Sequence, residues 1–287
     1  MTEPNLSGND VLYREIVERN LGVYTGAEQA RLRASRVLIC GLGGVGGMEA
    51  VLAARLGVGA ITGVDPDVFE VSNLNRQAFA LVSTLGRPKA EAATDVLRDI
   101  NPTTELDMRA VRIEESNADE LIAGHDLVLE AVDDMVSRVV IHRAARRLRV
   151  PSVAMSGSPP HRGFVSTFLP DGPSYEDTLG LPSAGRVLSD DVRGEIAAVK
   201  AARARFSIGR GAPAAWADAY LAGTAGWTIT VIRAVLLASF AVHEAAQVLI
   251  GRLPAAAAPK GYLIDLDANP PVAVEEPPGG VWDAAQL

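Results

Sequence analysis

The chain contains a single cysteine, Cys40, among its 287 residues. One thiol cannot form an internal disulfide, and this fits a reducing cytoplasm. The chain also lacks a long uncharged run: in the strongly apolar region 216–250, the longest such stretch spans residues 219–232. That stretch is shorter than the roughly 20 residues that a membrane span requires. No basic-then-apolar signal segment opens the sequence, so we expect a cytoplasmic protein without a membrane partner.

Basic residues are outnumbered in this sequence. Lysine and arginine total 27 against 35 acidic residues, which gives a net charge of −8. This balance makes nucleic acid and anionic membranes poor default partners. Hydrophobic residues make up 48% of the chain, which is enough to form the core of one large domain, with or without an extension.

A glycine-rich turn is the most informative stretch. The apolar run 37–40 predicts a buried strand, the sequence Gly-Leu-Gly-Gly-Val-Gly-Gly follows at 41–47, and an Ala- and Leu-rich helix continues to about residue 56. A second apolar run ends in Asp65, close to the roughly 20 residues that separate a phosphate-binding turn from a ribose-binding carboxylate. The pattern predicts a bound nucleotide, with its phosphates against Gly41, Gly43, Gly44 and Gly46.

The residues after Asp65 distinguish between classes of nucleotide. Redox enzymes, methyltransferases and nucleotide-activating enzymes all use such a turn, so the turn and Asp65 alone leave an NAD-dependent oxidoreductase open. Arg76 and Lys89 add two cations, which a triphosphate needs and the nicotinamide half of a dinucleotide does not. Asp133 follows a later predicted strand, where a magnesium ion could sit. Together these residues favour ATP with magnesium.

The motifs resemble the ThiF/MoeB/HesA family of ATP-dependent adenylyltransferases, which is related to the ubiquitin-activating enzymes. The resemblance is continuous over about 13–153 and returns more weakly at 219–251. It rests on the glycine turn, Asp65, the Asn73-x-x-Arg76-Gln77 box, Lys89, the segment from Asp133 to Arg138, and an N-terminal arginine, Arg14.

The resemblance implies a fold, a reaction and a role for each matching residue. The fold is a doubly wound sheet, the unit is usually a homodimer, and a carboxylate attacks the α-phosphate of ATP to give an acyl-adenylate and pyrophosphate. Asp65 would hold the ribose, Asp133 the magnesium ion, and Arg14 would reach the site from the partner subunit. Arg138 could contact either the nucleotide or the carboxylate substrate. The ATP-binding set is completed by Asp67, Asn73, Arg76, Gln77 and Lys89, and the catalytic set would be Arg14, Arg76, Lys89 and Asp133.

The chain departs from the family's pattern in its cysteines. Family members that act on ubiquitin-like sulfur carriers commonly bind zinc through two Cys-x-x-Cys pairs, and many carry a catalytic cysteine in a mobile loop. The first pair would fall near 173–177, where no cysteine occurs. Ligand count therefore excludes this zinc site, and a covalent thioester intermediate is in doubt.

Alternating strands and helices predict an α/β fold: a doubly wound, Rossmann-like, mostly parallel sheet with a C-terminal extension of helices and a strand. We expect core and dimer interface at 229–249, within a pair of buried helices. The expected segments are an N-terminal helical part at 1–32 that is frayed over 1–10, an ATP-binding core at 33–170, a variable substrate or lid segment at 171–215, helices and a strand that complete the same domain at 216–268, and a surface tail at 269–287.

Several alternatives stay open at this point. The basic helix predicted at 137–149 could face an acidic partner or only solvent, and His161 could act as a base, although an ionised carboxylate needs none. The carboxylate substrate could be the C-terminus of a ubiquitin-like protein, a peptide or a small molecule. A catalytically silent partner subunit is the remaining alternative, but such partners usually lose the equivalents of Arg76, Lys89 or Asp133, and all three are present.

Overall fold

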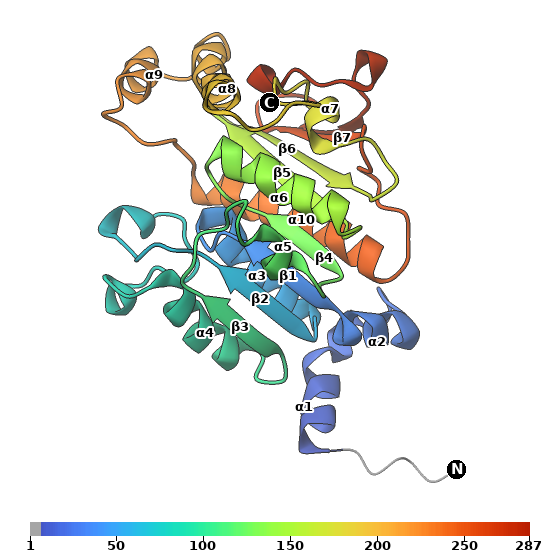
Figure 1. The fold of residues 1–287 in the computed structure, drawn as a ribbon. Coiled ribbons are helices and arrows are strands. Elements are labelled where there is room, and N and C mark those ends of the chain that lie inside the picture. The colour runs from blue at the N-terminus through green and yellow to red at the C-terminus, as the bar shows by residue number, and fades with distance from the viewer. Residues whose placement is uncertain (1–6) are drawn as a thin grey trace.

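One mixed sheet organises the computed structural model, which describes residues 7–287 (Figure 1). Within this part of the chain, eight strands follow the order β3-β2-β1-β4-β5-β6-β7-β8. The strands from β3 to β5 in this order pair in parallel, whereas β6, β7 and β8 are added antiparallel. The prediction of a doubly wound, mostly parallel α/β fold is confirmed. The strands are β1 (Arg36–Cys40), β2 (Ala60–Val64), β3 (Glu105–Arg109), β4 (Leu127–Glu130), β5 (Ser152–Ser158), β6 (Arg162–Phe168), β7 (Gly261–Asp265) and β8 (Val272–Glu275).

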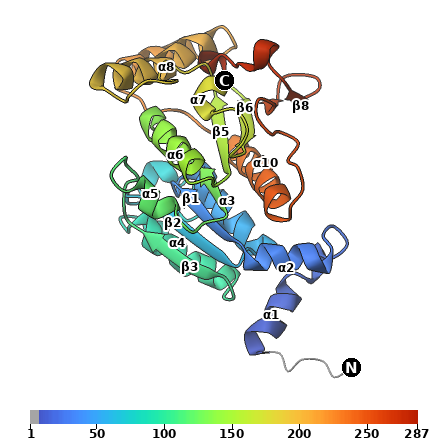
Figure 2. The ribbon, with the colours of Figure 1, turned by 45° about the vertical axis from the view of Figure 1, so that its right-hand side comes forward.

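Helices cover both faces of the sheet (Figures 1 and 2). Helices α3, α4 and α10 pack on one face, and α5, α6 and α8 on the other. The α-helices are α1 (Gly8–Ile16), α2 (Gly26–Ala34), α3 (Gly44–Leu56), α4 (Lys89–Ile100), α5 (Ala118–Ile122), α6 (Met135–Arg147), α7 (Tyr175–Thr178), α8 (Asp190–Ile208), α9 (Ala214–Leu221) and α10 (Val231–Leu249). Short 3₁₀ helices are η1 (Glu18–Asn20), η2 (Val71–Asn73), η3 (Val82–Thr84), η4 (Pro278–Gly280) and η5 (Ala284–Gln286).

The central strand β1 shows why the sheet is sandwiched between two helical layers. Val37 and Ile39 belong to the core shared with α3 and α10, whereas Leu38 and Cys40 belong to the core shared with α6. Because successive side chains of a strand point to opposite faces, a run of apolar residues requires cover on both sides. The apolar run at 37–40 therefore encodes a parallel strand at the centre of the molecule.

Helix α10 lies in the core, against α3, β5 and β6. Its buried face repeats at helical spacing through Ala234, Leu237, Ala238 and Ala241. By length and apolar composition alone α10 could cross a membrane, but half of its most apolar stretch is buried inside the structure, as in a core helix. The predicted second buried helix is wrong, because α9 buries only Ala217 and lies at the surface beside α8.

The residues at 269–287 lie largely at the surface, as expected, but the segment is anchored to the rest of the molecule and is not a free tail. Strand β8 pairs with β7 at the edge of the sheet. Trp282 is 9% exposed, packs edge-on against Phe164 at 5.2 Å, and donates its indole N–H to the carbonyl of Pro259 at 2.8 Å. Ala284 and Leu287 are buried as well. A proline-rich, acidic composition predicts exposure, but it does not reveal that this tryptophan has a partner.

The start of the chain is more ordered than its polar composition predicts. Residues 1–6 lie outside the described part, so the expectation of a frayed end is not tested there. Ser7 caps α1 and Asp10 completes a capping box, and Asp10 also pairs with Arg33 of α2 at 2.6 Å. This capping fixes both ends of the first helical turn, so fraying is the wrong prediction for residues 7–10.

Candidate functional site

A cavity of about 240 Å³ opens at the carboxyl ends of the parallel strands, between the ends of β1 and β4. The strand order reverses at this point, and ligands of open α/β sheets bind at such a switch. Of the residues predicted from the sequence, those that line the cavity are Gly41, Gly43, Gly44, Asp65, Asp67, Arg76, Gln77, Lys89, Asp133 and Arg138. The fold thus gathers segments that are far apart in the sequence around one space.

The glycine turn closes one side of this cavity. Gly41 has φ of 95°, and a Cβ there would lie 2.7 Å from the carbonyl oxygen of Ala131. Gly46 lies behind the turn, where a Cβ would lie 1.9 Å from the carbonyl oxygen of Gly41. Gly43 caps α3 without a side chain, which leaves the first N–H groups of α3 directed at the cavity end of the helix. These N–H groups form an anion site at a helix N-terminus.

Asp65 and Lys89 lie side by side at the end of β2, both nearly buried. Asp65 Oδ2 accepts the N–H of Leu42 at 2.7 Å, and Oδ1 accepts the N–H of Asp67 at 3.0 Å. The Lys89 Nζ lies 3.7 Å from Asp65 Oδ1 and 3.0 Å from Asp67 Oδ2. A carboxylate has about four acceptor positions, so Asp65 keeps capacity for further hydroxyl donors.

Arg76 covers the glycine turn from the other side. Its Cγ lies 3.3 Å from where a Cβ of Gly44 would be, and its Nη1 donates to the carbonyl of Ser72 at 2.9 Å. Gln77 is buried, and its Oε1 has no hydrogen-bond partner in the described structure. Asn73 does not line the cavity; its side chain is buried and accepts the N–H of Glu70 at 3.0 Å. Asn73 therefore holds the loop that carries Arg76.

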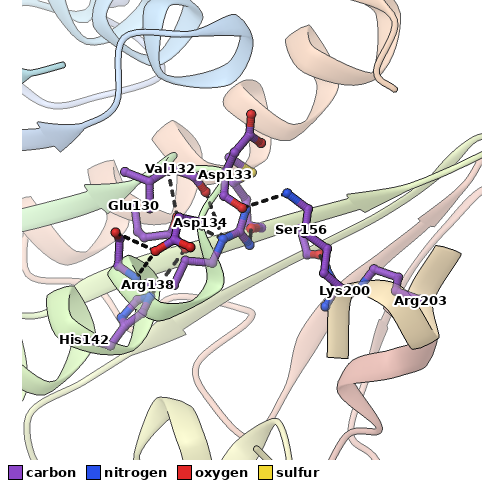
Figure 3. Close-up of polar contacts among 11 residues, drawn as sticks. Glu130, Val132, Asp133, Asp134, Arg138, His142, Ser156, Lys200 and Arg203 are labelled. Atoms are coloured by element: carbon purple, nitrogen blue, oxygen red, sulfur yellow. Dashed lines mark hydrogen bonds and ion pairs between the residues drawn. The ribbon is translucent and has the colours of Figure 1, made fainter. Parts of the chain in front are cut away.

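Two consecutive aspartates follow β4, and they differ in their partners (Figure 3). Asp134 caps α6, because its carboxylate accepts the N–H and the hydroxyl of Ser137 at 2.7 and 2.8 Å. The Asp133 carboxylate is exposed to the cavity and has neither a hydrogen bond nor an ion pair within residues 7–287. No cluster of three or more His, Cys, Asp or Glu residues in that range could hold a metal by itself. A magnesium ion here would depend on Asp133 and phosphate oxygens together, a donor set that suits this ion.

Glu130, at the end of β4, is a site-supporting residue that sequence reasoning missed. It is fully buried, and its carboxylate lies 3.5 Å from Nε of Arg138 and 3.7 Å from Nε2 of His142 (Figure 3). His142 stacks on Tyr175 with a centroid distance of 4.1 Å, and burial lowers the pKa of His142 below its ordinary value of 6.5. The sequence held one signal for Glu130: it is a charged residue at the end of an otherwise apolar strand, β4.

The other side of the cavity is formed by residues that no motif identified. Lys200 and Arg203 of α8 reach it from the segment 171–215, and Ser156 and Trp227 line it from β5 and the loop before α10. Lys200 Nζ donates to the carbonyl oxygen of Asp133 at 2.8 Å (Figure 3). Lys200, Arg203 and Ser156 lie in stretches without a family pattern, and Trp227 lies where the resemblance is weak, so only the fold brings these residues to the site.

Three further sequence candidates lie outside this cavity. Arg14 is exposed on α1, in a separate groove between the first two helices. His161 lies between β5 and β6 and does not line the cavity. The basic face of α6 is paired within the chain: Arg143 makes two bonds to Glu176, and Arg147 pairs with Asp119. Internal pairing explains these arginines without an acidic partner.

The comparison with protein families agrees with this geometry. The ThiF family model matches residues 17–274, which is most of the chain. The chain belongs to the ThiF family. The resemblance seen in the sequence is therefore confirmed.

Named relatives of this ThiF-family chain are adenylyltransferases or activating enzymes. The SAMP-activating enzyme E1 of Haloferax volcanii is 37% identical over 147 residues, which cover 51% of this chain and 54% of that protein. The molybdopterin-synthase adenylyltransferase of Haemophilus influenzae is 33% identical over 197 residues, which cover 63% of this chain and 79% of that protein. The match to the first of these relatives thus spans about half its length.

A solved structure of Escherichia coli MccB with AMPCPP and MccA superposes on this chain with a TM-score of 0.70 and 16% sequence identity. The match covers 97% of this chain and 75% of MccB. At this identity the likeness concerns the fold, and it agrees with the doubly wound sheet described above.

Proposed function

We propose that this chain is an ATP- and magnesium-dependent adenylyltransferase that activates a carboxylate as an acyl-adenylate and releases pyrophosphate. The observation that carries the proposal is the arrangement around one cavity: Arg76 and Lys89 flank the glycine turn, and the Asp133 carboxylate, which has no partner within residues 7–287, lines the same space. A pair of cations and a free carboxylate suit a magnesium–triphosphate complex. Membership of the ThiF family and the names of the relatives support the same reaction class.

Each part of the site would act on a different part of ATP. Asp65 would accept the ribose hydroxyls, while the N-terminus of α3, Arg76 and Lys89 would neutralise the phosphates. Asp133 would hold magnesium, which screens the phosphate charge and orients the α-phosphorus. The substrate's carboxylate oxygen then forms a bond to that phosphorus, and the bond to pyrophosphate breaks. No general base is needed, because the carboxylate is already ionised at neutral pH.

We further propose that the acyl group passes directly to a nucleophile, without zinc or a cysteine carrier. Cys40 is the only thiol in the chain, and burial raises its pKa well above the ordinary value, which keeps the thiol protonated. The carboxylate would belong to a ubiquitin-like protein, a peptide or a small molecule. The unit would be a cytoplasmic homodimer in which Arg14 serves the partner's site.

ATP–pyrophosphate exchange tests the proposal. The purified protein is assayed with magnesium against ubiquitin-like proteins that end in Gly-Gly, peptides and small carboxylates, with Asp133→Asn as the blank. Exchange that depends on one class of carboxylate supports adenylation and identifies the substrate. Formation of ADP and phosphate without AMP would contradict it.

A further inference from the structure

Lysine is rare in this chain, and only some of the lysines line the cavity. The sequence contains Lys89, Lys200 and Lys260. Lys89 and Lys200 line the same cavity, while Lys260 is exposed elsewhere. Lys89 begins α4 beside the glycine turn, whereas Lys200 comes from α8, which packs against β5 on the other side of the cavity. The cavity is therefore flanked by a lysine on each side, and the nucleotide proposal uses only Lys89.

The guanidinium groups of the arginines near Lys200 are hydrogen-bonded to other residues of the chain. Arg138 donates to the carbonyl oxygens of Val132 and Met155 at 2.9 and 2.8 Å. Arg203 donates to the carbonyl oxygen of Ala284 at 2.8 Å and to the hydroxyl of Ser156. Both guanidinium groups are buried. Their geometry suits a structural role, in which they fix β5, α8 and η5 around the cavity.

Lys200 differs from these arginines because it keeps donors free. Within residues 7–287, its one hydrogen bond is to the carbonyl oxygen of Asp133, at 2.8 Å. An ammonium group has three donors, so two remain for a ligand. Lys200 is half-buried and lines the cavity, so these donors lie where a ligand would bind.

Two aromatic side chains, Trp227 and Tyr220, form an aromatic wall beside Lys200. Its Nζ lies 5.3 Å from the ring centroid of Trp227, within the range of a cation–π interaction. Trp227 is itself fixed, because its indole N–H donates to the carbonyl oxygen of Gly157 at 2.9 Å. Tyr220 packs edge-on against the same ring at 5.1 Å. The wall gives Lys200 one orientation and offers an apolar surface to the group that carries an anion.

We propose that Lys200 binds the substrate's carboxylate and holds it beside the loop between β4 and α6, which carries Asp133. There the carboxylate oxygen would be placed to attack the α-phosphorus of ATP. This inference rests on the proposed adenylation. The carboxylate is the one anion of that reaction for which Arg76, Lys89 and the glycine turn provide no partner. Two anions must approach each other for the bond to form, and a cation on the carboxylate side reduces their repulsion. The recognised feature is the carboxylate itself, with Trp227 packing against the group next to it.

The test compares Lys200→Met and Lys200→Arg with Lys260→Met as the matched control. Two probes are titrated calorimetrically in the presence of magnesium: ATP, and 5′-O-(N-glycylglycylsulfamoyl)adenosine, a stable acyl-adenylate mimic. Adenosine 5′-sulfamate, which lacks the acyl group, is the reference ligand. We expect Lys200→Met to weaken binding of the mimic roughly tenfold or more, as for a lost hydrogen bond to a charged donor. Binding of ATP should change less than about twofold, and Lys200→Arg should restore part of the affinity for the mimic.

The outcomes separate this inference from the proposed function. If the wild-type protein binds the mimic no more tightly than adenosine 5′-sulfamate, the adenylation proposal fails, and the role of Lys200 fails with it. If the wild-type protein prefers the mimic but Lys200→Met binds it as well as Lys260→Met does, only the role of Lys200 is overturned. An equal loss of ATP and mimic would assign Lys200 to a phosphate and also overturn the inference.

Discussion

Arg138 and Glu130 hold the backbone of one residue, Val132, from two sides. Glu130 Oε1 accepts the N–H of Val132 at 2.9 Å, and Arg138 Nε donates to the carbonyl oxygen of Val132 at 2.9 Å. The two charged groups lie 3.5 Å apart and are both buried. This pair fixes the backbone immediately before Asp133, so a buried network sets the position of the proposed magnesium ligand.

Replacement of Glu130 by alanine should destabilise the protein strongly. The change leaves the Arg138 guanidinium buried without its counter-ion, which costs about 3–5 kcal/mol in comparable buried pairs. Urea denaturation would measure the free energy of unfolding. The matched control is Asp171→Ala, which breaks an exposed pair with Arg149, in which the side chains are 82% and 66% exposed. The control should lose no more than about 1 kcal/mol. Equal losses in the two variants would contradict a structural role for the buried pair.

Gly46→Ala should damage the nucleotide turn. A Cβ at this position would lie 1.9 Å from the carbonyl oxygen of Gly41, so α3 and the turn must move apart. We expect a loss of about 1–3 kcal/mol or more in stability, together with weaker ATP binding. The control is Gly194→Ala in α8, where a Cβ meets no atom within 4 Å. That helix position should gain roughly 0.5–1 kcal/mol. Similar melting temperatures for the two variants would disprove the close packing at Gly46.

Asp133→Asn should abolish activity without a loss of stability, and Asp134→Ala should lose stability without a loss of activity. The Asp133 carboxylate has no partner in the described structure, so the amide variant should keep the melting temperature while magnesium-dependent exchange falls to background. Asp134 caps α6, so the alanine variant should lose roughly 0.5–2 kcal/mol of stability and retain exchange. Both variants are measured by thermal melting and by exchange. Normal turnover of Asp133→Asn would remove the metal assignment.

The side of the cavity that carries the glycine turn was predictable because its signals are local in sequence. Gly41 and Gly46 are required by contacts within one strand–turn–helix unit, and Asp65 ends the next strand at a fixed spacing. Sheet topology then follows from strands that alternate with helices. The same logic predicted the position of Asp133 after β4.

The remaining features depend on contacts between distant segments, which periodicity does not encode. Trp282 packs on Phe164, more than a hundred residues away in the chain, and Lys200 meets the carbonyl of Asp133. Asn73 belongs to the predicted box but supports the loop at Glu70 and does not face the cavity. A motif identifies residues that act together, but it does not say which of them face the ligand.

The proposed action of Arg14 across a dimer interface can be tested by mixing two inactive variants. Arg14 is exposed on α1 and does not line the cavity of its own chain. If Arg14 serves the partner's site, a mixed dimer of Arg14→Ala and Asp133→Asn contains one complete site. Equal mixing should then restore activity at about a quarter of all sites. No recovery after confirmed subunit exchange, which can be monitored with differently tagged chains, would exclude action across the interface.

Glu49 should make stability depend on pH. This residue of α3 is fully buried, neither carboxylate oxygen has a partner in the described structure, and burial raises its pKa well above the ordinary 4.5. A group whose pKa is higher in the folded state stabilises the fold fully below the unfolded pKa, and this contribution is lost as pH rises through the folded pKa. The buried His142, whose pKa is lowered, has the opposite effect and acts below about pH 6.5. A comparison of the wild-type protein with a Glu49 variant between about pH 5 and pH 9 therefore isolates Glu49, because His142 is present in both.

In that range, the free energy of unfolding of the wild-type protein should fall with rising pH relative to that of Glu49→Gln, because the amide cannot ionise. The variant should be more stable than the wild type at the upper end of the range, although its amide is also unpartnered. Urea denaturation at several pH values gives the slope directly. Glu105→Gln is the control, because Glu105 has a 70% exposed side chain and should leave the slope unchanged. An unchanged slope in Glu49→Gln would mean that Glu49 is already ionised in the fold, and hence that water or an ion reaches it behind α3.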